Sequence, residues 1–250
     1  WGQSTLSLMN LYDKGLVPSI YGLLYGAVFV WKEPFQLQLE PLAHGVRSSF
    51  TRGDVAFATI NTVLYLRRSF FIGKNIRVLI GEVEALARQH GNCFGNATFP
   101  NSSDLPIYSL LLQFHLTPLY NTLHDLEGAT DTSREEVSFI LDKVPLLNND
   151  DILIATIAKK RYGPLHAVLA YQTLKSFMLR DLDNALDYTN QYMEHFGTKD
   201  LNLKHPSIWN TFYEALITFH FMRQTGEKHY QVRGENALMK MKKWSRHSDW

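Results

Sequence analysis

Apolar residues recur along most of the chain at the three- and four-residue spacing of an amphipathic helix, and no segment shows the sustained alternation of a strand. Between Val55 and Phe71 the apolar side chains fall on two adjacent stripes. A face of that width is expected of a helix that packs against two neighbours. The run from Ile76 to Ala87 keeps the same period. This pattern predicts an all-α protein.

Short polar stretches separate the apolar runs, and the Arg-Gly-Asp at residues 52–54 is one of them. Adhesion receptors recognise this tripeptide in other proteins, but its surroundings favour a turn. Asp54 can accept a hydrogen bond from a free backbone N–H in the first turn of a helix, and Gly53 tolerates the backbone angles of a tight turn. Gly73 is placed to end that helix and Asn75 to cap the next. We therefore interpret residues 52–54 as the turn of a helical hairpin.

Such turn signals fall about every twenty residues, which divides the chain into about twelve helices. The predicted helices cover residues 3–14, 18–32, 35–52, 55–71, 76–89, 105–126, 133–144, 150–161, 165–179, 182–196, 206–224 and 229–244. Helices joined in pairs by short turns are typical of tetratricopeptide-like arrays, in which each hairpin buries its apolar face on the next. We expect an α-solenoid of antiparallel hairpins, a tetratricopeptide-like superhelix, as one region over 1–250. The Gly- and Asn-rich loop 91–104 would separate sub-arrays 1–90 and 105–250.

Composition and charge exclude some classes of protein. Hydrophobic residues make up 45% of the chain and charged residues 20%, and the net charge is +1, so no global field indicates a nucleic-acid partner. The single cysteine, Cys93, excludes an internal disulfide and favours a reducing, cytoplasmic location. Because the first residue is Trp1 and not Met, we expect a piece of a longer protein.

Motifs of nucleotide and zinc chemistry are absent from the sequence: there is no GxxxxGK[ST], no GxGxxG, no HExxH and no cysteine pair. Asp183 and Asp187 share one helix face, but they lie near a helix start, where acids are favoured by the helix dipole. We expect no catalytic, cofactor-binding or metal site in this segment. The main alternative is an all-helical enzyme with a central cavity, in which acids or metal ligands converge from different helices.

One uncharged stretch suggests a membrane alternative. Residues 15–31 carry no charge and contain Gly22 and Gly26 at the small-xxx-small spacing of membrane helices. Pro18 and Ser19 dilute the stretch, and a helix buried between neighbours has the same composition. We expect no transmembrane span. A membrane-associated protein anchored by residues 15–31 is the second alternative.

The last predicted helix is basic and amphipathic, with an apolar stripe that ends at Trp244. Its basic side chains are Lys228, Arg233, Lys240, Lys242, Lys243 and Arg246. A helix of this kind can bind an acidic partner or an anionic membrane, whereas a repeat helix with a solvated basic face has the same pattern. We regard Lys240, Lys242, Lys243 and Arg246 as a possible partner surface.

Small motifs give the chain a family resemblance. Gly53-Asp54-x-x-x-Ala58, an aromatic-rich helix, Gly73 and an amphipathic helix with Glu82 together resemble the degenerate tetratricopeptide-like region of large multidomain signalling ATPases. Residues 170–186 and 209–250, with the ending Met-Lys-Lys-Trp at 241–244, are similar to the same region. The resemblance implies repeat-packing roles for Gly53, Asp54, Ala58, Gly73, Ala185 and Trp244.

The same resemblance implies where the chemistry of the parent protein lies. In this family a kinase-like domain and an AAA-type ATPase precede the array, and a sensor histidine kinase or nucleotide cyclase follows it. ATP and magnesium would then belong to other domains of the parent. This segment would be a non-catalytic, cytoplasmic scaffold or regulatory spacer in signal transduction, and it would contact other domains of the same chain or a protein or peptide partner.

Overall fold

The computed structural model describes residues 17–29, 33–96, 105–128, 162–196 and 206–246. Within these ranges the regular elements are nine α-helices and one π-helical segment, which confirms the predicted all-α class. The helices predicted at 3–14, 133–144 and 150–161 lie outside the described residues. The described helices form two compact units, which divide between residues 146 and 147.

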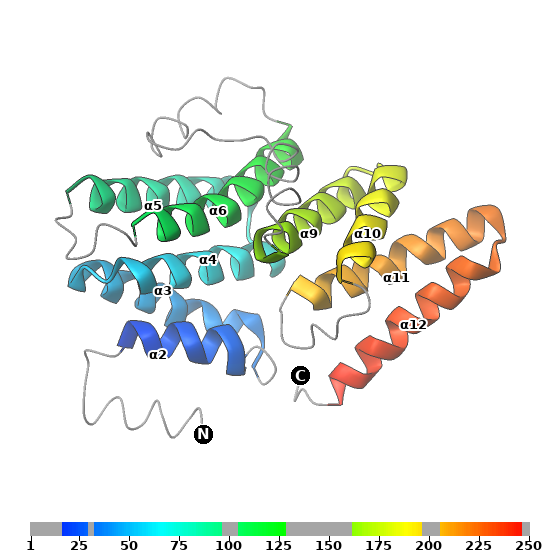
Figure 1. The fold of residues 1–250 in the computed structure, drawn as a ribbon, viewed down its shortest axis with the longest axis horizontal. Helices are drawn as coiled ribbons and strands as arrows, with labels where there is room; N and C mark the ends of the chain where they lie inside the picture. The colour runs from blue at the N-terminus through cyan, green and yellow to red at the C-terminus, as the bar shows by residue number, and fades with distance from the viewer. Residues whose placement is uncertain (1–16, 30–32, 97–104, 129–161, 197–205, 247–250) are drawn as a thin grey trace. The chain divides into compact units, whose positions relative to one another are not determined.

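In the first unit, α4 is the central helix. The elements of this unit are α2 (Val17–Leu23), the π-helix η2 (Leu24–Val28), α3 (Phe35–Arg52), α4 (Val55–Phe71), α5 (Ile76–Asn96) and α6 (Leu105–Glu127) (Figure 1). α4 packs against α2, α3, α5 and α6. Its two apolar stripes are explained by these neighbours, and Ala58 and Leu66 on them are fully buried.

The turns of this unit follow the local signals. Gly53 has a left-handed φ of 69° directly after α3, and the Asp54 side chain accepts a hydrogen bond of 3.1 Å from the N–H of Phe57. Gly73 has a φ of 79°, and Asn75 accepts a hydrogen bond of 3.3 Å from the N–H of Val78. The turn predicted at residues 52–54 and the helix start predicted at Asn75 are confirmed.

Glycines bring α2, η2 and α3 close to α4. A Cβ atom at Gly45 would lie 2.9 Å from the Cγ of Asn61, and one at Gly22 would lie 3.3 Å from the Oδ1 of Asn61. A Cβ atom at Gly26 would lie 3.1 Å from the Leu64 side chain. The small-xxx-small pair Gly22 and Gly26 therefore packs against α4. Over the ranges that the structure describes, no helix has the length and apolarity needed to cross a membrane.

Two buried polar side chains bind backbone carbonyls of η2 and of Phe29, the residue that follows it. Arg68, which is fully buried in α4, donates a hydrogen bond to the carbonyl of Tyr25, and Gln38 donates one of 2.9 Å to the carbonyl of Phe29. Burial and the neighbouring Arg67 lower the pKa of Arg68 to about 9. A side chain that binds a backbone carbonyl perturbs the helical hydrogen-bond pattern. The regular helix predicted over 18–32 is accordingly replaced by a π-helix from Leu24.

The predicted loop 91–104 begins later than expected, because α5 continues to Asn96. Gly91 and Asn92 have low helix propensity, but tertiary packing offsets it. His90 is fully buried, with its Nε2 3.1 Å from the Oγ1 of Thr62. α5 and α6, which flank residues 97–104, pack against each other in one unit. The division of the chain into sub-arrays 1–90 and 105–250 stays a prediction.

The second unit consists of two further helical pairs. Its helices are α9 (Tyr162–Met178), α10 (Leu182–Phe196), α11 (Pro206–Thr225) and α12 (Lys228–Ser245). α11 packs against α9, α10 and α12, and its Ile217 and Phe221 form a core cluster with Ala185. α11 and α12 form a hairpin (Figure 1), in which a Cβ atom at Gly234 would lie 2.9 Å from the Phe219 ring. This close approach places α12 along one side of α11.

Candidate functional site

A groove of about 410 Å³ opens on the second unit, where α10, α11 and α12 meet. Met193 of α10 and Ala237 and Met239 of α12 supply its apolar lining. Ala237 is buried, whereas Met239 is 62% exposed. The groove therefore combines a closed apolar floor with an open apolar edge.

The basic face of α12 lines the same groove. Arg233, Lys240 and Lys243 are lining residues, and they occur at the three- and four-residue multiples that keep side chains on one side of a helix. Of the four basic residues predicted as a partner surface, the structure brings Lys240 and Lys243 to the groove. Lys242 and Arg246 are exposed outside its lining.

A partly buried ion pair lies in the wall of the groove. The Arg233 Nε donates to the Oε1 of Glu214 across 2.7 Å, and the Arg233 Nη1 donates to the Oδ1 of Asn190 across 2.6 Å. These contacts join α10, α11 and α12. Sequence reasoning included Arg233 among the basic residues but missed Glu214. The available signal was that Glu214 is the single acidic residue of the aromatic-rich stretch 206–225.

A second polar pair supports the helices around the groove. The hydroxyl of Tyr192 lies 2.6 Å from the Nε2 of His166, and both side chains are buried. Burial raises the pKa of Tyr192 to about 12, with a smaller lowering effect from the side chain of Asn210 and a further raising effect from the negative charge of Glu214. The phenol is thus protonated at neutral pH. The pair joins α9 to α10. Because both side chains are buried, the pair offers no group to a substrate.

The electrostatics of the groove favour a negative ligand. Residues 238–246 contain four basic and no acidic side chains. In the lining, Arg233 is neutralised by Glu214, which leaves the charges of Lys240 and Lys243. Neither lysine forms an ion pair with any residue in the described part of the chain. Two solvated cations beside an apolar surface suit a carboxylate-bearing ligand with apolar side chains.

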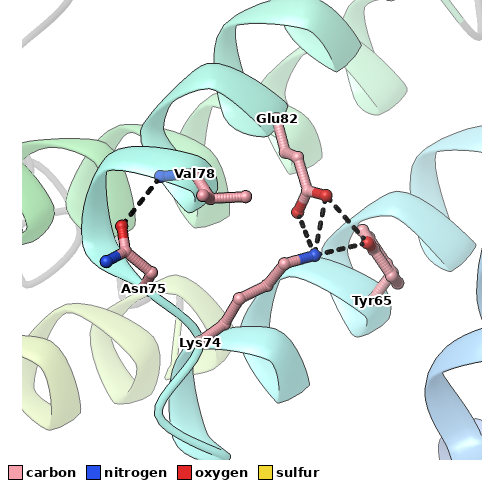
Figure 2. A network of polar contacts seen from close by, with 5 residues as sticks. All are labelled: Tyr65, Lys74, Asn75, Val78 and Glu82. Atoms are coloured by element: carbon pink, nitrogen blue, oxygen red, sulfur yellow. Dashed lines mark hydrogen bonds and ion pairs between the residues drawn. The ribbon is translucent and has the colours of Figure 1, made fainter.

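In the first unit, the polar side chains of Tyr65, Lys74 and Glu82 bind one another (Figure 2). The Lys74 Nζ lies 2.7 and 2.8 Å from the two carboxylate oxygens of Glu82 and 3.1 Å from the hydroxyl of Tyr65. Burial acts to lower the pKa of Lys74, but the hydrogen bonds to Glu82 and Tyr65 outweigh it and raise the pKa. The lysine stays protonated and ties the α4–α5 turn to α5. The network is a structural contact, not a catalytic base.

The residues with predicted repeat-packing roles lie in several hairpins and form no joint site. Gly53, Asp54 and Gly73 lie at turns, Ala58 and Ala185 are fully buried, and Trp244 is half-buried near the end of α12. These positions suit the packing of hairpins. Their equivalence as repeat positions stays a prediction.

Metal and thiol chemistry have little support in the described ranges. No group of three or more His, Cys, Asp or Glu side chains there could hold a metal ion. Burial raises the pKa of the Cys93 thiol, which opposes formation of the nucleophilic thiolate. Asp183 and Asp187 are exposed on α10, and Asp187 accepts a hydrogen bond of 2.8 Å from Gln191.

Comparison with family models, curated proteins and solved structures finds no match to the chain. The groove of the second unit is the candidate site because it joins accessible charge and apolar surface in one place.

Proposed function

We propose that this chain is a non-catalytic helical-repeat scaffold or regulatory segment of a multidomain signal-transduction protein, and that it mediates protein–protein or interdomain contacts in the cytoplasm. The observation that carries the proposal is the groove of α10, α11 and α12, with two lysines that pair with no acidic residue of the described ranges, beside an apolar lining. Its buried carboxylate is occupied by an internal contact, since the Nε of Arg233 binds Glu214. Such a surface is suited to hold a partner rather than to transform a substrate.

The proposed architecture is an α-solenoid of about twelve helices in a tetratricopeptide-like superhelix. Support comes from the pairing of successive helices: α3 packs on α4, α5 on α6, α9 on α10, and α11 on α12. Contacts between successive pairs, α4 with α5 and α10 with α11, fit the nearest-neighbour packing of such arrays.

The family resemblance extends the proposal to the parent protein, in which AAA-type ATPase and kinase or cyclase domains would use ATP and magnesium. The complete reading frame tests this part. A frame with an ATPase region and a histidine kinase or nucleotide cyclase region supports it. A frame that encodes none of them contradicts the family assignment and leaves the groove as the basis of the scaffold role.

The scaffold role is tested by selecting binders from a random peptide library against the whole chain. Each selected peptide is then measured on the chain and on the double variant Lys240→Glu/Lys243→Glu. A matched control is Arg52→Glu/Arg223→Glu, which makes the same change of charge at two exposed positions. Neither residue lines the groove.

We expect selected peptides that bind the chain and the control variant and lose binding to Lys240→Glu/Lys243→Glu. Peptides that bind all three proteins equally would contradict the groove as the binding surface. Saturable binding of a metal ion or nucleotide to the chain, without selected peptides, would favour the all-helical enzyme.

A further inference from the structure

The exposed side of α12 carries a stripe with two apolar side chains, Val232 and Met239, which continues the edge of the groove. Val232, Asn236, Met239 and Lys243 follow one another at four, three and four residues, so they lie along one line of the helix. Val232 is 47% exposed and Met239 is 62% exposed. Among the described helices, α11 is the main packing partner of α12. The stripe is therefore an open helix face with spaced apolar anchors.

A helix is the occupant that fits this face. A peptide that binds as an added strand needs a free strand edge, and α12 offers none because its backbone groups are bonded within the helix. An extended polyproline segment needs an aromatic-lined groove, and no aromatic residue of the described ranges lines this one. A second helix instead binds through side chains spaced at three and four residues. Val232 and Met239 are seven residues apart, two turns of α12, which matches a partner helix with apolar side chains repeated every two turns.

Charge determines which helix fits. Lys243 ends the stripe, and Lys240 follows Met239 directly in the sequence. Both lysines line the groove, and neither is paired with a described acidic residue. Exposed charge pairs contribute little affinity, but they steer association and exclude partners of like charge. Burial of the Met193 and Met239 side chains would supply most of the binding free energy.

Resting on the proposed function, we infer that the groove and the exposed stripe of α12 bind an acidic amphipathic helix of a partner protein. Apolar side chains of that helix pack on Met193, Ala237 and Met239. Its carboxylates lie against Lys240 and Lys243. The groove is open but is lined by side chains of three helices, with Ala237 buried at its base, so it suits inserted side chains better than a flat membrane surface.

The test uses three fluorescent peptides of about 18 residues, a length at which an alanine-rich sequence is helical. The first carries leucines along one face and glutamates beside them. The second replaces its leucines with serine, and the third replaces its glutamates with lysine. Binding to the whole chain is followed by fluorescence anisotropy at low and high salt, and circular dichroism verifies that each protein variant is folded.

We expect saturable binding of the first peptide, weakened by salt, and at least about tenfold weaker binding of the other two. Lys240→Glu/Lys243→Glu should weaken the binding of the first peptide at least about tenfold, and Met239→Ser should weaken it about fivefold. The control Arg52→Glu/Arg223→Glu should bind within about twofold of the parent chain. Binding of the serine peptide as tight as the leucine peptide would overturn the inference, because charge alone would then suffice.

Two further results would overturn it. One is binding to phosphatidylserine vesicles that depends on Lys240 and Lys243, without binding of the first peptide, which would assign the face to a membrane. The other is a library selection that gives groove-dependent peptides of neutral or basic composition. That result would refute the acidic helix and leave the scaffold role intact.

Discussion

The guanidinium of Arg233 and the carboxylate of Glu214 form an ion pair of 2.7 Å between α12 and α11, and the two partners differ in exposure. The Glu214 side chain is 5% exposed and the Arg233 side chain 24%. The carboxylate therefore depends on Arg233 for its compensating charge. This pair fixes the position of α12 beside the groove.

Replacement of Arg233 by Met should lower the free energy of unfolding by roughly 3 kcal/mol, because it leaves a buried carboxylate without its partner. The double variant Arg233→Met/Glu214→Met should lose less than the sum of the two single changes, since it removes both charges. Urea unfolding followed by circular dichroism measures all three. Lys242→Met, an exposed position on the same helix, is the control and should stay within about 0.5 kcal/mol. A loss for Arg233→Met as small as that of the control would show that the pair is dispensable.

Gly45 and Gly81 both lie within helices, and their replacement by alanine should change the free energy of unfolding in opposite directions. A Cβ atom at Gly45 would lie 2.9 Å from the Cγ of Asn61, whereas one at Gly81 would meet nothing within 4 Å. Gly45→Ala should lower the free energy of unfolding by roughly 1–3 kcal/mol through overpacking. Gly81→Ala should raise it by about 0.5–1 kcal/mol, since alanine favours the helix. Thermal unfolding of both variants checks this, and stabilisation by both would show that α3 and α4 are further apart.

Ala58 provides a test of the register of α4. Because it is fully buried in a helix with four neighbours, Ala58→Trp should overpack the unit and lower stability by roughly 1–3 kcal/mol. Ala85→Trp on the exposed side of α5 is the matched control and should leave the melting curve nearly unchanged. Equal melting curves for the two variants would mean that position 58 is exposed.

His90 should make the stability of the first unit depend on pH. Burial lowers the pKa of His90 to about 4 from an ordinary value of 6.5. Between these values the unfolded chain binds a proton that the folded chain does not, so the contribution is present above pH 6.5 and is lost as pH falls toward 4. The full loss is on the order of 3 kcal/mol.

The measurement compares the parent chain with His90→Gln in urea at pH 7.5, 5.5 and 4.5. The parent should be the more stable protein at pH 7.5, and its advantage should shrink as the pH falls, because glutamine does not titrate. An advantage that stays constant over this range would show that His90 does not titrate between the folded and unfolded states as its burial requires.

Local signals were sufficient for the helices and their turns. A left-handed Gly53 and an Asp54 cap depend on residues within one turn of the chain, so a reader of the sequence can place them. The extension of α5 past Gly91 could not be read in this way, since propensity opposes it and burial of His90 against Thr62 favours it.

By itself, the sequence determined the all-α class, most helix boundaries and the basic character of the last helix, because periodicity, capping and charge are properties of neighbouring residues. Tertiary structure alone decided which polar groups meet: Arg68 and Tyr25 are 43 residues apart, and Arg233 and Glu214 are 19 apart. It also separated Lys240 and Lys243 from Lys242 and Arg246, since only the first two lie beside the groove. Contacts between helices depend on how their faces pack, and no local pattern along a single helix contains that information.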